Sequence, residues 1–430
     1  MNFVMFTPAL QASAIGRMAC MVTRALMAAG HTVTIVRAEA DALLTEPVHP
    51  FETELVAWND AARVHALLAK ADVLVYQIGD NYTFHRGCME WLPHAPGLVC
   101  LHDFFIAHLF WAWAEDRRPE ATSILSNWYG ADVARAFFSH TDSASFIHAT
   151  HRTAPMTEWI SSMAIGVITH SNWGIDRVLD GCAGPVQVVP LPYDAPDMAD
   201  ARDPALHDGV FRVLTVGNVN PNKRVASVIR AIGASEALRP VTRYRLVGAI
   251  VPAMVVELSS LARNSQVNLV ISDQVEGPIL TSAFEESDVI TCLRFPSLEA
   301  ASASAIEAML CGKPVIVTDA NFYSEIPDDC VIKIDPADEA GALQRALERL
   351  CADPALRAEL GARGQAWARA TFRADHYAER LAGMAVDASR AKPVLDAINA
   401  LTHTLSNWGA SADLLNAAHT AGPLALFDER

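Results

Sequence analysis

The sequence predicts an α/β protein made of two doubly wound domains that face a central cleft. Short apolar runs alternate with segments of helical periodicity along both halves of the chain, which is typical of parallel sheets covered by helices. Residues 190–204 separate the halves and are rich in Pro and Asp, the composition of an interdomain linker. The length of 430 residues also exceeds what one hydrophobic core usually serves.

The first half of the chain contains the apolar runs that we interpret as strands of the first sheet, residues 3–6, 32–36, 73–76, 98–101, 167–169 and 186–189. A helix is expected over residues 18–26, because apolar side chains recur there at helical spacing until Gly30 stops the pattern. A shorter helix is expected around residues 64–68. Residues 104–155 are aromatic and His-rich without a clear period, and we interpret them as helices and loops inserted into this domain.

The second half repeats this alternation, with strands expected at residues 212–216, 244–247, 267–271, 288–292, 315–318 and 331–334. Helices are expected from Val225 onward, over residues 253–263 and over residues 303–310, where Gly312 and Pro314 follow. From Glu339 the chain reads as helical. We place the domains at residues 1–195 and 208–372, and expect C-terminal helices in residues 373–430 to pack back on the first domain.

Charge and composition exclude several classes of protein. Lys and Arg total 33 against 49 Asp and Glu, a formal net charge of −16 that disfavours binding to nucleic acid. The start of the chain has no basic segment before its apolar run, and the longest apolar run, residues 104–114, is too short to span a bilayer. The eight cysteines include no CxxC pair. We therefore expect a soluble cytoplasmic protein with free thiols.

Several motifs that carry chemistry are absent. The sequence has no GxGxxG, no GxxxxGK[ST], no HExxH, no GxSxG and no DxD at a strand end. His148 and His151 have the spacing of a metal pair, but surface or capping roles explain them better. We expect neither a bound metal nor a cofactor.

The turn after residues 212–216 has the features of an anion site. Gly217 and Asn218 follow the strand, and Lys223 and Arg224 stand at the start of the next helix. Backbone N–H groups and the positive end of a helix dipole favour phosphate, and two cations would neutralise a diphosphate leaving group. The alternative is a solvated pair of charges that opens a helix.

A second loop places two glutamates eight positions apart. Glu299 falls in the loop before the helix of residues 303–310, and Glu307 falls about one turn inside it. A carboxylate accepts two hydroxyl hydrogen bonds well, so Glu307 suits a ribose diol and Glu299 a sugar hydroxyl near the phosphate. Either residue alone could instead be a capping or dipole partner.

These glutamates, the Ala-Met-x-x-Gly-x-Pro-Val that follows Glu307 and the Val-Gly-x-x-x-Pro-x-Lys that ends at Lys223 resemble glycosyltransferase family 4, the glycosyl transferases group 1. This resemblance implies the glycosyltransferase-B fold of two Rossmann-like domains, with the acceptor on the first and the nucleotide-sugar donor on the second. It also implies a retaining, metal-independent enzyme. By the same resemblance, Lys223 contacts the donor diphosphate, Glu299 the transferred sugar and Glu307 the ribose.

The sequence departs from the family pattern at two places. The family has Gly-Arg where this chain has Gly217-Asn218, so one phosphate cation is lost unless Arg224 replaces it. The family's Glu-Gly-Phe-Gly turn is here Glu299 followed by Ala300, Ala301 and Ser302, which removes glycines that let backbone amides approach a pyrophosphate. Ala301, Ser302 and Ala303 would then line the diphosphate, with the hydroxyls of Ser302 and Ser304 as substitute donors.

The resemblance also assigns residues outside these loops. Gly16 and Arg17 lie in the first-domain loop that the family brings to the donor phosphate and acceptor. His102, after residues 98–101, resembles the cleft histidine of many members, with a structural histidine as the alternative. Gln274 and Val275 would lie near the nucleotide base.

The function implied is transfer of a hexose from a GDP- or UDP-linked sugar to a saccharide or lipid-linked acceptor, commonly for envelope or extracellular polysaccharide. The first domain is itself acidic, so contact with the inner face of the membrane should be peripheral and local. Two alternatives stay open: a sugar-nucleotide epimerase of the same fold, and a sugar-nucleotide-binding protein without catalysis.

Overall fold

The first domain is built on a parallel sheet of seven strands in the order β3-β2-β1-β4-β5-β6-β7, as a computed structural model of the chain shows. The structure describes residues 1–195, 209–272 and 278–409. The strands of this sheet are β1 (Asn2–Thr7), β2 (Thr32–Arg37), β3 (Leu55–Ala57), β4 (Val73–Ile78), β5 (Leu98–Leu101), β6 (Gly166–Thr169) and β7 (Val186–Val188). The central strands are buried on both faces, which explains why they are continuous apolar runs.

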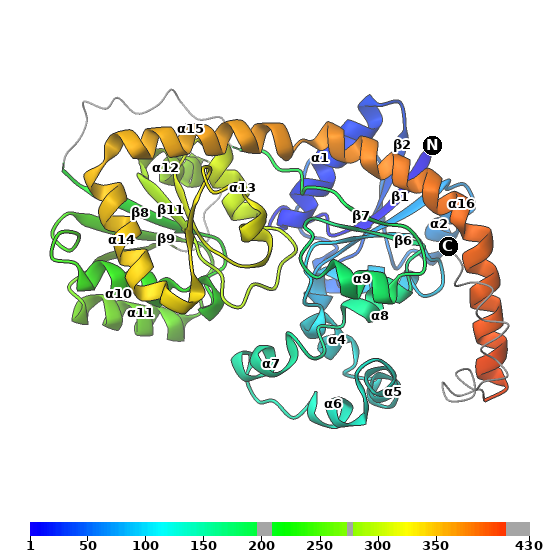
Figure 1. The fold of residues 1–430 in the computed structure, drawn as a ribbon. Coiled ribbons are helices and arrows are strands. Elements are labelled where there is room, and N and C mark those ends of the chain that lie inside the picture. Colours follow the sequence, from blue (N-terminus) through cyan, green and yellow to red (C-terminus); the bar gives the residue numbers. More distant parts are fainter. Residues whose placement is uncertain (196–208, 273–277, 410–430) are drawn as a thin grey trace.

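The helices of the first domain are α1 (Ala14–Ala28), α2 (Ala61–Leu68), α3 (Tyr82–Trp91), α4 (Ala107–Trp113), α5 (Arg118–Tyr129), α6 (Ala131–Ala136), α7 (Ser143–Thr150), α8 (Thr157–Ser162) and α9 (Ile175–Gly181). The helix α1 begins at a side-chain cap, since the Ser13 hydroxyl accepts from the Gly16 N–H at 3.0 Å. The helices α4 to α7 form a lobe beside the sheet (Figure 1), held by packed aromatic rings such as Phe110 against Phe137.

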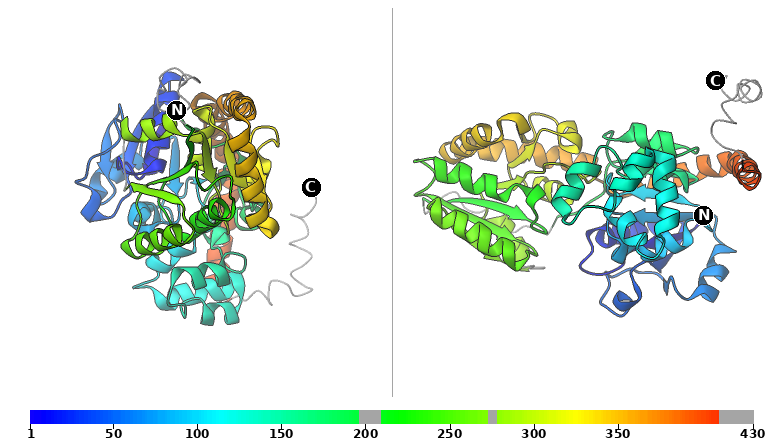
Figure 2. Two further views of the ribbon diagram at one scale, coloured as in Figure 1. Left: turned by 90° about the vertical axis from the view of Figure 1, so that its left-hand side faces the viewer. Right: turned by 90° about the horizontal axis from the view of Figure 1, so that it is seen from below.

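The second domain has a parallel sheet of six strands in the order β10-β9-β8-β11-β12-β13. Its strands are β8 (Phe211–Val216), β9 (Thr242–Val247), β10 (Asn268–Ser272), β11 (Val289–Cys292), β12 (Val315–Thr318) and β13 (Ile332–Ile334). Its helices are α10 (Val225–Ala234), α11 (Pro252–Asn264), α12 (Pro278–Glu286), α13 (Ala303–Leu310), α14 (Glu339–Ala352) and α15 (Pro354–Thr371), with short 3-10 turns η3 (Pro221–Lys223) and η4 (Asn321–Glu325) near the cleft. The prediction of two doubly wound α/β domains is therefore confirmed (Figure 2).

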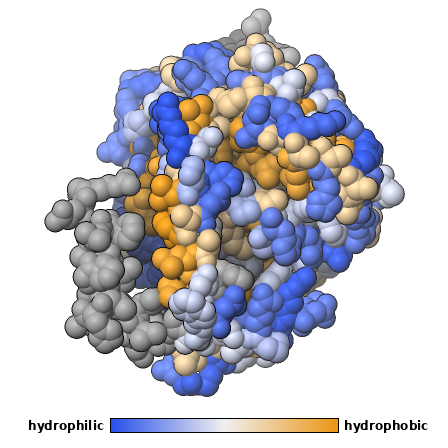
Figure 3. Space-filling view, turned by 90° about the vertical axis from the view of Figure 1, so that its right-hand side faces the viewer, coloured by the Kyte–Doolittle hydropathy of each residue, from blue (hydrophilic) through white to orange (hydrophobic). Residues whose placement is uncertain are grey.

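The helix α16 (Ala374–Asn407) leaves the second domain and runs along the first, where it contacts α1 and β6 (Figure 1). Tyr377, Leu381 and Met384 of this helix are buried in a core that the two domains share. The later turns of α16 expose Val394 and Leu401, and Figure 3 shows apolar surface at this end of the molecule. Within the described ranges, none of the helices combines the length and apolar character needed to cross a membrane.

Candidate functional site

A cavity of about 940 Å³ lies between the two domains. Arg17, Asp80 and Asp103 line it from the first domain, and Gly217 and Glu307 line it from the second. The carboxyl ends of parallel strands from both sheets border it, which is where open α/β sheets bind ligands. The cavity is large enough for a small-molecule ligand of nucleotide-sugar size.

The loop that carries Glu299 is bonded to the first domain across this cleft. The Leu298 carbonyl accepts from the Phe104 N–H at 2.9 Å, and the Ala300 N–H donates to the His102 carbonyl at 2.9 Å. These bonds flank Glu299 on both sides. The carboxylate is therefore held at the domain boundary, with little freedom for its backbone.

The turn after β8 is built around Gly217 and Lys223. Gly217 has a φ of +95°, a conformation that favours glycine, and Lys223 in η3 folds back so that its ammonium nitrogen donates to the Val216 carbonyl. Lys223 is only 5% exposed. Burial, with the nearby positive charge of Arg294, holds the pKa of Lys223 well below its usual value. This amine therefore lies against the turn that the sequence assigned to a diphosphate, at a place where an anion would favour its charged form.

Arg224 is held by a carboxylate of its own domain, although the sequence suggested it as a second phosphate cation. Like Lys223 and Glu299, it lies behind the residues that line the cavity. Its guanidinium donates from Nε to Glu339 Oε2 at 2.8 Å and from Nη2 to Glu339 Oε1 at 2.7 Å. This two-point pair ties the start of α10 to α14. The charge of Arg224 is thus engaged by a partner that the local sequence pattern did not reveal.

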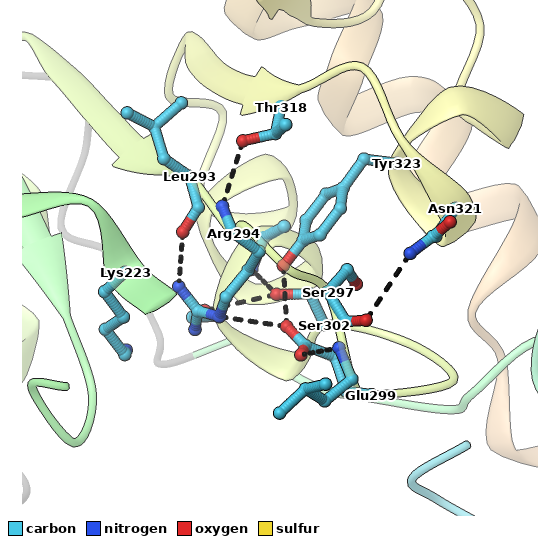
Figure 4. A network of polar contacts seen from close by, with 12 residues as sticks. Lys223, Leu293, Arg294, Ser297, Glu299, Ser302, Thr318, Asn321 and Tyr323 are labelled. Atoms are coloured by element: carbon cyan, nitrogen blue, oxygen red, sulfur yellow. Dashed lines mark hydrogen bonds and ion pairs between the residues drawn. The ribbon is translucent and has the colours of Figure 1, made fainter. Parts of the chain in front are cut away.

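Glu299 is oriented by two residues that the sequence analysis did not select (Figure 4). Its Oε1 lies 2.9 Å from Arg294 Nε and accepts a hydrogen bond from the Tyr323 hydroxyl at 2.9 Å. Arg294 follows β11, and Tyr323, which is fully buried, lies in η4. A lone cation between a buried strand and Pro296 is the signal that could have identified Arg294.

The amino end of α13 lies next to this network. The Ser302 hydroxyl caps the helix by accepting from the Ala305 N–H at 3.3 Å, and it lies 3.3 Å from the Ser304 hydroxyl. Ala301 is buried, and Ala303 is the first residue of the helix. The predicted diphosphate-binding segment therefore opens a helix, with one of its hydroxyls already used as a cap.

Glu307 is bonded to the other domain. Its Oε1 lies 2.9 Å from Arg17 Nη1, and the Arg17 guanidinium also reaches Asp194 at 2.7 Å and stacks over the Tyr193 ring at 4.7 Å. Burial raises the pKa of Glu307, and the charge of Arg17 partly offsets this effect. The structure thus joins the predicted ribose carboxylate to the predicted phosphate-loop arginine.

His102 is buried away from the cavity, and its neighbour Asp103 lines the cavity instead. The His102 Nε2 lies 2.7 Å from Gln77 Oε1, and burial together with His170 holds the pKa of His102 well below its usual value. Successive side chains of an extended segment point to opposite sides, so only one of two adjacent residues after β5 faces the cleft. Of these two neighbours, Asp103 lines the cavity, and the role in the cleft that the resemblance implies for His102 stays a prediction.

Asp103 should make the stability of the protein depend on pH. Burial, with the adjacent charge of Asp80, raises the pKa of Asp103 to about 7. Between about pH 4 and pH 7 the folded chain keeps a proton that the unfolded chain loses, so this group lowers the free energy of unfolding as pH rises. Asp103→Asn keeps the side chain neutral and should raise Tm more at pH 8 than at pH 5.

Thermal unfolding of the wild type and of Asp103→Asn at these two pH values tests this expectation, with each 1 kcal/mol worth roughly 2–4 °C. Asp80, His108 and Glu299 also act on this carboxyl, and they are unchanged in the variant. An equal change of Tm at both pH values would contradict the raised pKa. Glu52→Gln is a control on the exposed surface.

The remaining predicted residues fall at different places. Gly16 lies inside α1, where an added Cβ would come within 2.7 Å of the Pro8 carbonyl oxygen, so only glycine fits. Asn218 lines the cavity beside Gly217. Gln274 and Val275 lie outside the described residues.

The comparisons with known proteins agree with this architecture. The family model of the glycosyl transferases group 1 matches residues 198–367, and this confirms the resemblance at the level of group 1 for the second domain. Family 4 membership stays a prediction. No curated protein matches the chain.

Several solved structures share the fold. Sucrose-phosphate synthase from Thermosynechococcus elongatus has 17% identity and a TM-score of 0.61, covering 93% of this chain and 100% of its own. Anabaena HepE in complex with UDP and glucose has 14% identity and a TM-score of 0.59, with 89% and 98% covered. WaaG, a glycosyltransferase involved in lipopolysaccharide biosynthesis, has 16% identity and a TM-score of 0.56, with 88% and 99% covered. These likenesses confirm the glycosyltransferase-B fold.

Proposed function

We propose that this chain, whose second domain matches the glycosyl transferases group 1, is a retaining, metal-independent glycosyltransferase that moves a hexose from a nucleotide-diphosphate sugar. The observation that carries the proposal is the cleft itself, where Gly217 and Glu307 face Arg17 and Asp103 across one cavity. Turn amides, a ribose-binding carboxylate and a second domain for the acceptor are the parts that such a transfer needs.

In the proposed reaction, the donor diphosphate lies on the turn at Gly217 and near the start of α13, and Glu307 binds the ribose. Glu307 then exchanges part of its contact with Arg17 for ribose hydroxyls. Glu299 lies beside the sugar and stabilises the positive charge that develops at the anomeric carbon as its bond to the diphosphate oxygen breaks. Lys223, charged once an anion is bound, stabilises the departing phosphate.

The acceptor hydroxyl oxygen then bonds to the anomeric carbon on the face that the diphosphate leaves, which retains configuration. The departing phosphate takes the proton of that hydroxyl, so no second carboxylate is needed as a nucleophile. Asp103 lines the cavity from the first domain, the domain to which this proposal assigns the acceptor. We further propose a saccharide or lipid-linked acceptor, a role in envelope or extracellular polysaccharide synthesis, and a cytoplasmic location with at most peripheral membrane contact.

A thermal-shift screen with UDP, GDP, ADP, dTDP and their sugar conjugates, in EDTA, tests the proposal. A ligand at about 100 times its Kd stabilises the fold by about 2.7 kcal/mol, so one base should raise Tm clearly without metal. UDP comes first, because HepE is described in complex with UDP and glucose. GDP is the other candidate.

If no nucleotide or sugar nucleotide of the panel raises Tm, with or without magnesium, the proposal of a nucleotide-sugar enzyme loses its basis. Incubation of the stabilising sugar nucleotide alone is the second arm of the experiment. An isomeric sugar nucleotide as its product would identify an epimerase. A shift in Tm without transfer to any acceptor would favour a binding protein.

A further inference from the structure

We propose that Arg294 supplies the second diphosphate-binding charge of the donor site, in place of the arginine that Asn218 does not provide. The inference rests on the proposed function, because it names the cation that meets the donor's phosphates. The sequence left two choices for this role: no replacement, or Arg224. The contacts within the second domain favour Arg294 over Arg224 for this role.

The fold places Arg294 beside the turn at Gly217. The strands β8 and β11 are neighbours in a parallel sheet, so the loops that follow them emerge side by side. The Phe295 N–H donates to the Asn222 carbonyl at 2.9 Å, which bonds the Arg294 loop directly to the loop of Lys223. The Arg294 N–H also donates to the Thr318 hydroxyl at 3.0 Å, so its backbone is fixed from the other side.

The Arg294 side chain is fixed as well, and it is only 12% exposed. Its Nη1 donates to the Leu293 carbonyl at 2.9 Å, and its Nε lies 2.9 Å from Glu299. Figure 4 shows the guanidinium between Glu299 and the Lys223 side chain. A rigid cation at low exposure interacts with an anion more strongly than a solvated one.

The charges in this region change when Lys223 is protonated. In the free protein the lowered pKa of Lys223 leaves Arg294 paired with Glu299, and a charged Lys223 would make two cations share this one carboxylate. The pKa of Lys223 is held down partly by Arg294, which indicates that the two groups lie within electrostatic reach. A diphosphate would supply the negative charge that lets Lys223 and Arg294 be charged together. Arg224 lacks this setting, because two of its nitrogens already face Glu339.

The test compares the affinities for UDP and uridine, and for GDP and guanosine, in the wild type and in Arg294→Gln by titration calorimetry. UDP and GDP lack the transferred hexose, so the proposed contact of Glu299 with that hexose plays no part in their binding. We expect UDP or GDP, whichever binds the wild type, to bind Arg294→Gln about 10- to 100-fold more weakly, with the nucleoside unchanged.

A rescue variant, a surface control and a charge-conserving variant sharpen the test. Asn218→Arg in the Arg294→Gln background should recover most of the diphosphate affinity, and unchanged nucleoside affinity in Arg294→Gln shows that the single variant is folded. Arg345→Gln is the matched surface control, since Arg345 pairs with Asp338 on the outer side of α14. Arg294→Lys, which keeps the charge, should lose less affinity than Arg294→Gln.

Three results would overturn the inference: unchanged UDP and GDP affinity in Arg294→Gln, an equal loss for nucleoside and diphosphate, or a tenfold loss in Arg224→Gln with none in Arg294→Gln. If the wild type binds no nucleotide, the proposed function fails first and the inference falls with it. If the wild type binds UDP or GDP and the variants give one of these three results, the inference fails and the proposed function stands.

Discussion

Replacing Glu299 with alanine is expected to lower the turnover number for sugar transfer about 100- to 1,000-fold, the cost of losing one group that stabilises transition-state charge. Arg294 and Tyr323 fix its carboxylate from two directions, and backbone bonds to the first domain hold its loop. The carboxylate is therefore placed before substrate arrives. Glu299→Gln keeps the shape without the charge and should lose nearly as much.

The nucleoside diphosphate should still bind to Glu299→Ala, because Glu299 is assigned to the sugar rather than to the phosphates. Steady-state transfer rates and UDP or GDP binding, measured on the same preparation, separate the two effects. Tyr323→Phe removes one of the orienting hydrogen bonds and should give a smaller loss. Glu359→Ala on the exposed surface of α15 is the control. Intact turnover in Glu299→Ala would refute both the residue's role and the mechanism built on it.

The sequence revealed most strands because burial on both faces leaves a plain signal. The strands β5 and β12 were predicted at their observed bounds, and every residue in them is buried. The strand β3 was missed because three residues are too few for a pattern. The helix α3 was missed because it contains Gly87 and a non-helical residue, His85, which interrupt its period.

The two glutamates of the site could also be identified from the sequence, because they belong to motifs that follow one another along one segment. The ion pairs of the site could not be identified in this way. Arg224 pairs with Glu339, which lies 115 positions away, and Arg17 pairs with Glu307 in the other domain. Arg294 acquires its place only when β11 is known to lie beside β8. Contacts of this kind depend on topology, which local periodicity does not encode.

Lys223→Met should weaken binding of the nucleoside diphosphate about 10- to 100-fold while removing a pH dependence from the stability of the free protein. The pKa of Lys223 is held well below its usual value by burial and by Arg294, although Cys292 and Glu299 act in the opposite direction. Between the lowered pKa of the folded chain and the ordinary lysine pKa, the unfolded chain therefore carries a proton on this amine that the folded chain lacks. This group makes the free energy of unfolding rise with pH, by at most about 1.4 kcal/mol per pH unit.

Urea unfolding of the wild type and of Lys223→Met at pH 7 and pH 9 measures the contribution of Lys223 together with its effect on Cys292, because groups that do not interact with Lys223 titrate equally in both proteins and cancel in the difference. The advantage of the wild type should grow with pH. Calorimetry of UDP or GDP binding at pH 8 gives the complementary result, because a bound diphosphate should recharge Lys223 and take up a proton. The binding enthalpy of the wild type should then vary with the ionisation enthalpy of the buffer, and that of Lys223→Met should not. Binding without proton uptake would mean that Lys223 is already charged in the free protein, or that the diphosphate does not reach it.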